Sequence, residues 1–155
     1  VTVIYADLDN FKVYNDIYGF AQGDNIIIFT ANVIRVSMQV AGCGDSFLGH
    51  VGGDDFVLIV PAEKCTTVAE EIISRIDKGI RAFYSAEDLE RGHVIATIRG
   101  GKEKKYSFVS LSLGAVDLTR RKFSTPLEIV DICTETKKAA KARQGSNLFL
   151  DQRLG

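Results

Sequence analysis

Five consecutive residues, Gly52 to Phe56, place two glycines and two carboxylates between the apolar runs 47–51 and 56–60. Adjacent glycines allow left-handed backbone angles and let a bulky anion approach the main chain. Paired aspartates at the tip of a hairpin offer the hard oxygen ligands that Mg²⁺ prefers. Taken alone, the segment is explained equally well by a solvated Gly-Asp turn.

A second acidic segment begins where the first apolar run of the chain ends. Residues 1–6 are rich in β-branched side chains, which predicts a buried strand, and they lead directly into Asp7 and Asp9. A Mg²⁺ ion that serves a nucleotide is usually held by one or two carboxylates together with phosphate oxygens and water. We therefore predict a split metal site made by Asp7 and Asp54, provided that their strands are neighbours. The alternative for Asp7 is a cap at the end of a strand.

Six ordered motifs, which extend through nearly the whole chain, resemble those of the GGDEF domains. This family includes the diguanylate cyclases, which join two GTP molecules into cyclic di-GMP. The motifs are residues 7–12, Asn15-Asp16 with Gly19, Gly23-Asp24, Gly52 to Phe56, residues 110–114, and Ala140-Lys141 with residues 145–147.

The resemblance implies a set of catalytic and metal-binding residues. It places the metal ligands at Asp7, the backbone carbonyl of Leu8, and Asp54, with Asp54 and Asp55 as the catalytic carboxylates. The implied cofactor is Mg²⁺ or Mn²⁺, because divalent ions can stabilise charge on the transferring phosphorus and the departing pyrophosphate. The implied assembly is a homodimer in which two domains meet face to face, each holding one GTP.

The resemblance also implies four residues that bind GTP, namely Asn15, Asp24, Lys12 and Lys141. An amide and a carboxylate complement the O6 acceptor and the N1 and N2 donors of guanine, which suits Asn15 and Asp24. The lysines match phosphate-contacting positions. The structural alternatives are helix caps for Asn15 and Asp24 and solvated surface positions for the lysines.

Three residues depart from the family pattern near the expected phosphates. Asp55 stands where Glu is usual, and its carboxylate reaches roughly 1.3 to 1.5 Å less. His50 and Ser146 stand where active members often carry basic residues. A misplacement of about 1 Å can cost on the order of 100-fold in rate. These changes favour a second interpretation, a catalytically degenerate GTP-binding domain that regulates an attached domain such as a phosphodiesterase.

The inhibitory product site of the family requires Arg-x-x-Asp shortly before the signature. Aligning Asp45 with that Asp puts Gly42 where the Arg belongs. Glycine cannot hold a phosphate in a bidentate manner. We predict no inhibitory site here.

Composition limits the remaining possibilities. The chain has 155 residues and 46 % hydrophobic content, which predicts one compact domain over residues 1–155. The resemblance implies that this single domain is GGDEF-like. Its net charge of -1 argues against non-specific nucleic-acid binding. Three widely spaced cysteines favour reduced thiols, and the chain contains no apolar run of about 20 residues. We expect a cytoplasmic domain that makes no membrane contact. We also expect it to be a piece of a longer protein that carries a sensor or phosphodiesterase domain. A membrane anchor in another part of that longer protein stays an open alternative.

Hydrophobic periodicity predicts the elements that must position these residues. Helices are expected at 11–18, 25–40 and 66–86, with Thr66 or Thr67 as a cap, and from Pro126 onward, with Ser124 or Thr125 as a cap. Strands at 47–51 and 56–60 form one predicted hairpin, and strands at 93–99 and 106–116 form another. The order predicts an α+β fold with a mainly antiparallel central sheet flanked by helices, which the resemblance refines to a ferredoxin-like, nucleotidyl-cyclase-type core.

Overall fold

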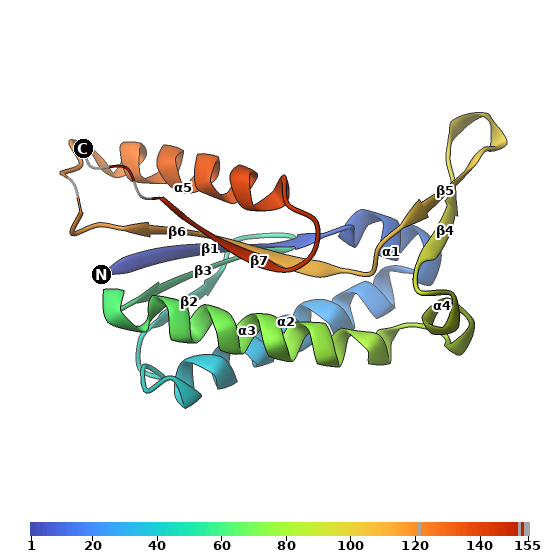
Figure 1. Cartoon of the computed structure of the whole chain (residues 1–155), viewed down its shortest axis with the longest axis horizontal. Coiled ribbons are helices and arrows are strands. Elements are labelled where there is room, and N and C mark those ends of the chain that lie inside the picture. Colours follow the sequence, from blue (N-terminus) through green and yellow to red (C-terminus); the bar gives the residue numbers. More distant parts are fainter. Residues whose placement is uncertain (121, 152, 154–155) are drawn as a thin grey trace.

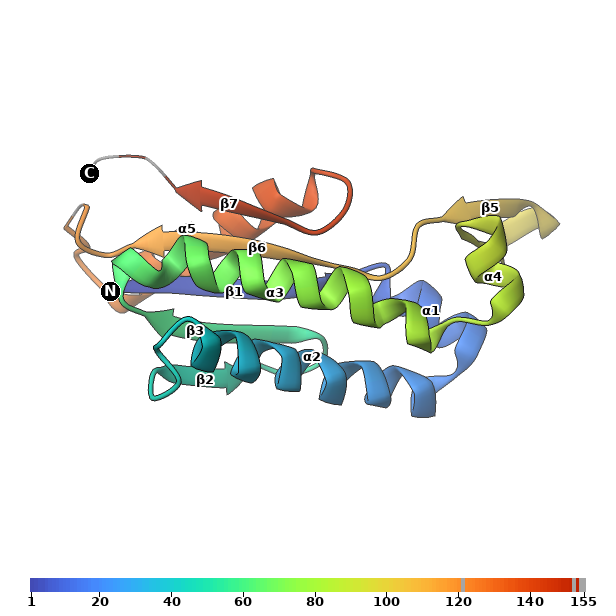
Figure 2. The same ribbon diagram turned by 60° about the horizontal axis from the view of Figure 1, so that its bottom comes forward.

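A five-stranded sheet in the order β2-β3-β1-β6-β7 forms the centre of the molecule. The computed structural model describes residues 1–120, 122–151 and 153. Helices α2 and α3 cover one face of the sheet and α5 covers the other (Figures 1 and 2). The predicted α+β fold with a mainly antiparallel sheet is confirmed, since of the four strand pairs only β6 and β7 run parallel. The strands of the sheet are β1 (Thr2–Asp9), β2 (Phe47–His50), β3 (Asp55–Val60), β6 (Ser110–Asp117) and β7 (Asn147–Asp151), and the helices are α1 (Phe11–Tyr18), α2 (Phe20–Val40), α3 (Cys65–Gly79), α4 (Ala86–Arg91) and α5 (Pro126–Lys141).

Strand β1 lies between β3 and β6 and divides its side chains between the two faces. Ile4, Ala6 and Leu8 belong to the main core under α2 and α3, whereas Val3 packs with residues of α5 and β6. Because side chains alternate along a strand, Asp7 shares the α5 face with Val3. The alternation therefore directs the first acidic segment toward α5.

Small residues on β6 allow α5 to lie close to the sheet. A Cβ atom added to Gly114 would come within 2.5 Å of the backbone nitrogen of Lys137 and 2.7 Å of the carbonyl carbon of Thr136. Real Cβ atoms do not approach backbone that closely. The absence of a side chain at Gly114 thus lets the middle of α5 contact the strand.

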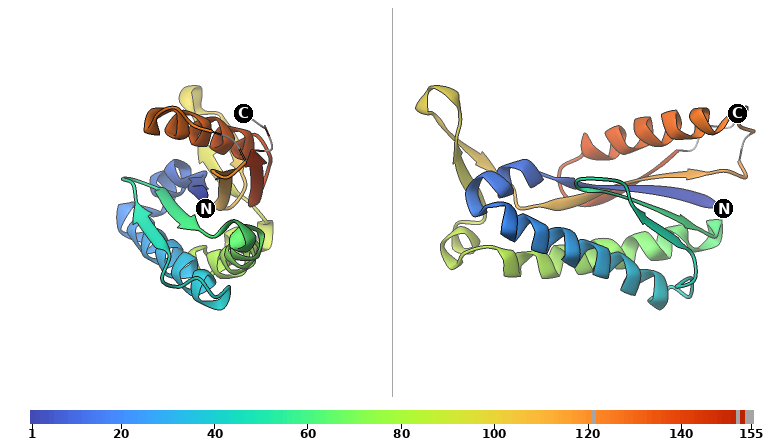
Figure 3. Two further views of the ribbon diagram at one scale, coloured as in Figure 1. Left: turned by 90° about the vertical axis from the view of Figure 1, so that its left-hand side faces the viewer. Right: turned by 180° about the vertical axis from the view of Figure 1, so that it is seen from behind.

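The strand pairing predicted for the second hairpin is wrong. The strand predicted at 93–99 is β4 (Val94–Thr97), and it pairs with β5 (Glu103–Tyr106), which lies mostly in the predicted connection. The strand predicted at 106–116 is β6, which pairs with β1 and β7. The β4–β5 ribbon projects from the end of the molecule that carries α1 and α4 (Figure 3). Periodicity identified strands here, but their partners depend on contacts distant in sequence.

The predicted helices are confirmed with changed ends. Helix α2 begins at Phe20, and α3 begins at Cys65 without a side-chain cap, so the caps predicted from Thr66 or Thr67 are wrong. The long helix predicted at 66–86 ends at Gly79, and α4 follows it after a short 3₁₀ turn. Thr125 caps α5 with Pro126 in its first turn, as predicted. Strand β7 was missed.

Two further predictions concern the cysteines and membrane-spanning segments. Cys43, Cys65 and Cys133 are buried, and none of them is in a disulfide in this structure. The expected reduced state stays a prediction. Among the described residues, no helix combines the length and apolarity needed to cross a bilayer.

Candidate metal and nucleotide site

The β1–β3 pairing brings the two acidic segments together. Asp7 stands directly opposite Asp55, and the Leu8 N–H donates to the Asp54 carbonyl oxygen over 3.3 Å. Residues directly opposite each other in an antiparallel pair project to the same face. Asp7, Asp54 and Asp55 each offer a carboxylate oxygen, and these oxygens all lie within 4.8 Å of one another. The structure therefore brings Asp7 and Asp54 together, as the split site requires.

The turn that carries Asp54 depends on its two glycines. Gly52 and Gly53 have φ angles of 71° and 51°, in the left-handed region that glycine adopts without steric cost. The Asp55 N–H closes the turn on the Gly52 carbonyl oxygen at 3.2 Å. His50 stabilises the same turn, because its Nε2 lies 2.7 Å from the Gly53 carbonyl oxygen and its ring stacks on Phe56.

Burial and mutual repulsion raise the pKa values of two of these carboxyl groups. The pKa of Asp54 is raised by burial and then by the negative charge of Asp7. The pKa of Asp55 is raised to about 6 by burial and then by its hydrogen bond to, and the charge of, Asp7. Burial is the larger cause of both shifts, and the negative charge of Asp7 adds to it. A cation that binds between these groups would relieve that repulsion.

Two lysines from α5 point into the carboxylate cluster. The Nζ atoms of Lys137 and Lys141 both lie 3.4 Å from Asp7 Oδ2, and Lys137 Nζ is also 3.8 Å from Asp55 Oδ1. Residues four apart on a helix share a face, so both ammonium groups reach the same end of the sheet. Lys137 was missed from sequence, although its spacing from Lys141 was a usable signal.

Lys141 contacts the oxygens predicted to bind a metal. Its Nζ donates to the Leu8 carbonyl oxygen at 3.2 Å and to Asp9 Oδ1 at 2.9 Å. Burial alone would lower the pKa of Lys141, but its hydrogen bond to Asp9 and the charges of Asp9 and Asp7 raise it overall. One cation can thus touch Asp7 and the Leu8 carbonyl together. With Asp54 alongside, this oxygen-only set fits a hard divalent ion.

Asp9 is held in place by its neighbours. Its carboxylate accepts hydrogen bonds from Ser110 Oγ at 2.7 Å and from Ser112 Oγ at 2.9 Å, in addition to its contact with Lys141. The small hydroxyl side chains of Ser110 and Ser112 on β6 therefore support a charged partner on β1. Asp9 is a positioning group for Lys141.

The residues predicted to recognise guanine lie beyond the C-terminal end of β1, on α1 and α2. Asn15 on α1 lies against Gly23 of α2, since a Cβ at Gly23 would fall 1.7 Å from Asn15 Oδ1. That oxygen is buried without a hydrogen-bond partner among the described residues. Asp24 is exposed within α2, and because the helix begins at Phe20, a cap role for Asp24 is ruled out. Lys12 is exposed on α1.

The positions that depart from the family pattern have structural roles in this chain. Ser146 Oγ donates to Asp77 at 2.7 Å and accepts from the Leu111 N–H at 3.0 Å. Gly42 lies in a turn after α2 with a φ angle of 84°, where an arginine would be strained. Asp45 is exposed nearby in sequence.

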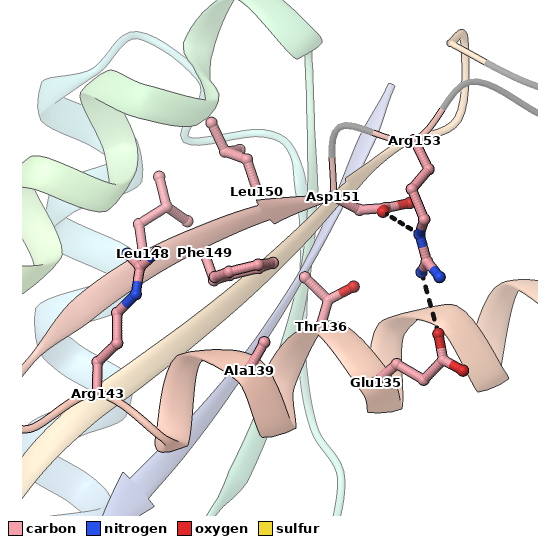
Figure 4. Close-up of a pocket in the computed structure, with 9 residues that line it drawn as sticks. All are labelled: Glu135, Thr136, Ala139, Arg143, Leu148, Phe149, Leu150, Asp151 and Arg153. Carbon is pink, nitrogen blue, oxygen red and sulfur yellow. Dashed lines mark hydrogen bonds and ion pairs between the residues drawn. The ribbon is translucent and has the colours of Figure 1, made fainter.

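Two hollows flank the C-terminal end of α5. A groove of about 480 Å³ is lined by Asp9, Lys141, Arg143 and the β5 lysines Lys104 and Lys105, among others. Figure 4 shows the other, about 790 Å³ between α5 and β7, where Arg153 pairs with Asp151 and Glu135. Of the two, only the groove lined by Lys141 is connected to the carboxylate cluster, through the contact of Lys141 with Asp7.

Comparison with known families identifies the chain. The family described as diguanylate cyclase, GGDEF domain, matches residues 1–144. The chain therefore belongs to the GGDEF family, which confirms the resemblance stated from its motifs.

Similar curated proteins are much longer than the matched segment. The chain is 35 % identical over 79 residues to the bifunctional diguanylate cyclase/cyclic di-GMP phosphodiesterase MucR of Pseudomonas aeruginosa. It is 37 % identical over 78 residues to the cyclic di-GMP phosphodiesterase PdeR of Escherichia coli and 31 % identical over 78 residues to a diguanylate cyclase of Vibrio cholerae. These matches cover 49 %, 49 % and 48 % of this chain, but only 11 %, 11 % and 23 % of the relatives.

Solved structures confirm the fold. The GGDEF domain of PA1120 (YfiN or TpbB) from Pseudomonas aeruginosa superposes with a TM-score of 0.67 at 19 % identity, over 98 % of this chain and 82 % of that one. The active GGEEF domain of a diguanylate cyclase from Vibrio cholerae gives a TM-score of 0.61 at 20 % identity, over 97 % and 83 % of the two chains. The nucleotidyl-cyclase-type core predicted from the resemblance is thus confirmed as a GGDEF fold.

Proposed function

We propose that this domain condenses two GTP molecules into cyclic di-GMP as a face-to-face homodimer. The observation that supports this most directly is the meeting of Asp7, Asp54 and Asp55 beside the Leu8 carbonyl. Mg²⁺, or Mn²⁺ in its place, would be held by Asp7, the Leu8 carbonyl and Asp54. Such an ion supplies charge stabilisation for the phosphoryl group and the leaving pyrophosphate.

The protein side chains would divide the remaining tasks. Asn15 and Asp24 bind the guanine edge, and Lys12 and Lys141 bind phosphate oxygens. Asp55 has a pKa of about 6, near the range at which a general base is effective. It is suited to accept the proton of the attacking 3'-hydroxyl. The partner domain would present that hydroxyl, which makes the dimer a requirement of the reaction.

The groove beside Lys141 offers a path for the terminal phosphates. Three of its cationic side chains, Lys104, Lys105 and Arg143, come from β5 and from the turn after α5. The carboxylate of Asp9 in this groove is already matched by Lys141. Local positive charge at this groove could therefore compensate for the neutral Ser146, although the chain as a whole carries a net charge of -1.

Product formation tests the proposal. The protein, concentrated or fused to a dimerising segment, is incubated with GTP and Mg²⁺, and cyclic di-GMP is measured. We expect product that falls at least about 100-fold in Asp54→Ala, because a ligand and a transition-state charge contact are lost together. Asp16→Ala, at an exposed position on α1, is the matched control and should retain activity. Absence of product from the dimerised protein would contradict the proposal.

The second candidate is a GTP-binding domain that regulates an attached phosphodiesterase or sensor domain in a longer protein. It is favoured by the lysine contacts to Asp7 and by the structural roles of His50 and Ser146. Thermal stabilisation by GTP without cyclic di-GMP would support this candidate. The absence of both stabilisation and product would exclude the two functions together.

A further inference from the structure

Lys137 differs from Lys141 in how firmly the fold positions it. Its side chain is 20 % exposed, against 32 % for Lys141, and it lies between Asp7 and Asp55. Its own backbone nitrogen is part of the close contact between α5 and Gly114. Lys141 instead is the last residue of α5, where the chain turns away. The base of the Lys137 side chain is therefore held over the carboxylates by a backbone contact.

The two ammonium groups share Asp7 but differ in their second carboxylate partner. Lys141 is matched by Asp9, which lies outside the carboxylate cluster. Both carboxylates that Lys137 contacts belong to the cluster. If Lys141 turns toward a phosphate, Asp7 keeps its contact with the ammonium group of Lys137. Movement of Lys137 would leave Asp7 and Asp55 to repel each other.

We propose that Lys137 acts as a resident cation beside Asp7 and Asp55, so that the site takes a single divalent ion and not the pair of ions that many phosphoryl-transfer sites use. That ion would be held by Asp7, the Leu8 carbonyl and Asp54. This inference rests on the proposed GTP and metal site, and it assigns Lys137 as a positioning and charge-balancing residue.

Charge balance gives the physical reason. When ionised, the three carboxylates of the cluster carry three negative charges. The ammonium group of Lys137 offsets one, and a single divalent ion matches the other two. Without Lys137, the excess negative charge would attract divalent ions more strongly. The shorter side chain of Asp55 fits this arrangement, because a carboxylate that pairs with Lys137 has less need to reach a second metal.

Titration with Mn²⁺ in the absence of nucleotide tests the inference. The free ion is followed by electron paramagnetic resonance in wild type and in Lys137→Met, which keeps an unbranched side chain only one atom shorter but removes its charge. We expect wild type to bind at most one ion per chain. Lys137→Met should bind Mn²⁺ about tenfold more tightly and take up a second equivalent.

Three further variants isolate the cause. Lys138→Met removes a neighbouring exposed lysine on α5 and should titrate like wild type. Lys137→Arg keeps the charge and should also resemble wild type. Lys137→Met combined with Asp54→Ala should lose the tight binding, which assigns it to the cluster. Circular dichroism checks that each variant is folded.

Several results would overturn the inference. They are a wild-type protein that binds two Mn²⁺ ions, a folded Lys137→Met that binds no better than wild type, and a Lys138→Met that gains as much. Failure of Lys137→Met to bind Mn²⁺ at all would do the same. These titrations involve neither GTP nor product, so their outcome is separate from the test of cyclase activity.

Discussion

The two ends of the proposed nucleotide site differ in how their polar groups are satisfied. At the metal end, defined by Asp7, Leu8, Asp54 and Asp55, internal ammonium groups already contact the ligand oxygens. At the guanine end, defined by Asn15, Gly23 and Asp24, Asn15 Oδ1 has no partner among the described residues and Asp24 is exposed.

The difference in how the polar groups are satisfied suggests that the guanine end governs nucleotide binding and the metal end governs catalysis. An unpaired buried oxygen such as that of Asn15 costs free energy unless a ligand or water completes it, so the guanine end is prepared for a partner. The metal end balances part of its charge internally and departs from the usual signature at Asp55. Substitutions at the guanine end should therefore have different measurable effects from substitutions at the metal end.

The largest expected effect follows from adding one methyl group under the metal end. Gly114→Ala places a Cβ against the backbone of α5, which cannot yield as a flexible side chain can. We expect a loss of about 3 kcal/mol in the free energy of unfolding, or roughly 6–12 °C in Tm. Thermal unfolding followed by circular dichroism measures it.

A glycine on the same sheet provides the control. In Gly49→Ala the new Cβ is crowded by the ring of the exposed Phe47, which can move, and its distance of 4.0 Å to the Val57 carbonyl oxygen is an ordinary contact. That variant should change Tm much less. Equal losses in the two variants would refute the idea that α5 depends on its contact with Gly114.

A methyl group added at Gly23, at the guanine end, should weaken GTP binding and should not lower the stability of the fold. In Gly23→Ala the new Cβ meets Asn15 Oδ1, which is the end of a side chain and can move aside. Alanine inside a helix also favours folding by roughly 0.5–1 kcal/mol relative to glycine. We expect unchanged or higher Tm but about tenfold weaker GTP binding, since one base-reading amide is displaced.

Calorimetry with GTP measures the effect, and Gln22→Ala at the preceding exposed position is the control. Binding of Mn²⁺ should be unaffected, because the side chains nearest the new Cβ, those of Asn15 and Phe11, do not belong to the carboxylate cluster. If Gly23→Ala bound GTP as wild type does, Asn15 would have no role in recognising the base.

The smallest expected effect concerns the pH dependence of the metal-free domain. The pKa of Asp55 is raised from 3.8 to about 6 in the folded state, so the folded state binds this proton more tightly than the unfolded chain does. The resulting stabilisation is fully present below pH 3.8 and is lost as the pH rises through 6. Asp55→Asn should therefore show a smaller fall in Tm between pH 4.5 and 7.5, by roughly 2–4 °C after allowance for solvent screening.

Differential scanning calorimetry across that pH range measures the difference, with chelator present throughout. Asp45→Asn, at an exposed position before β2, is the matched control and should follow wild type. Parallel curves for wild type and Asp55→Asn would show that Asp55 titrates normally.

Much of the candidate site could be predicted from local sequence. The glycines at 52 and 53 indicated a turn that few other residues could form, and the apolar run before Asp7 indicated a strand that ends in a carboxylate. Those two facts, with the resemblance, were enough to propose that Asp7 and Asp54 meet. Local patterns succeeded because turn chemistry and strand alternation depend on adjacent residues.

Pairing across long sequence separations could not be predicted in the same way. The residues at 93–99 and 106–116 have the pattern of strands, but β6 joins β1 because the central sheet buries both of its faces. The short β5, rich in lysine, lies in what looked like a connection and pairs with β4 instead. Periodicity reports which face of a strand is buried and does not report which strand lies beside it.

The sequence by itself determined the chemistry available to this protein: the carboxylates of Asp7, Asp54 and Asp55, the amide of Asn15, and the lysine at 141. The tertiary structure decided that Lys137 shares the metal end with them. Its sequence is that of an ordinary helical lysine, and it contacts Asp7 and Asp55 only because Gly114 lets α5 pack closely against β6. That contact joins residues far apart in the chain, so only the packed fold could reveal it.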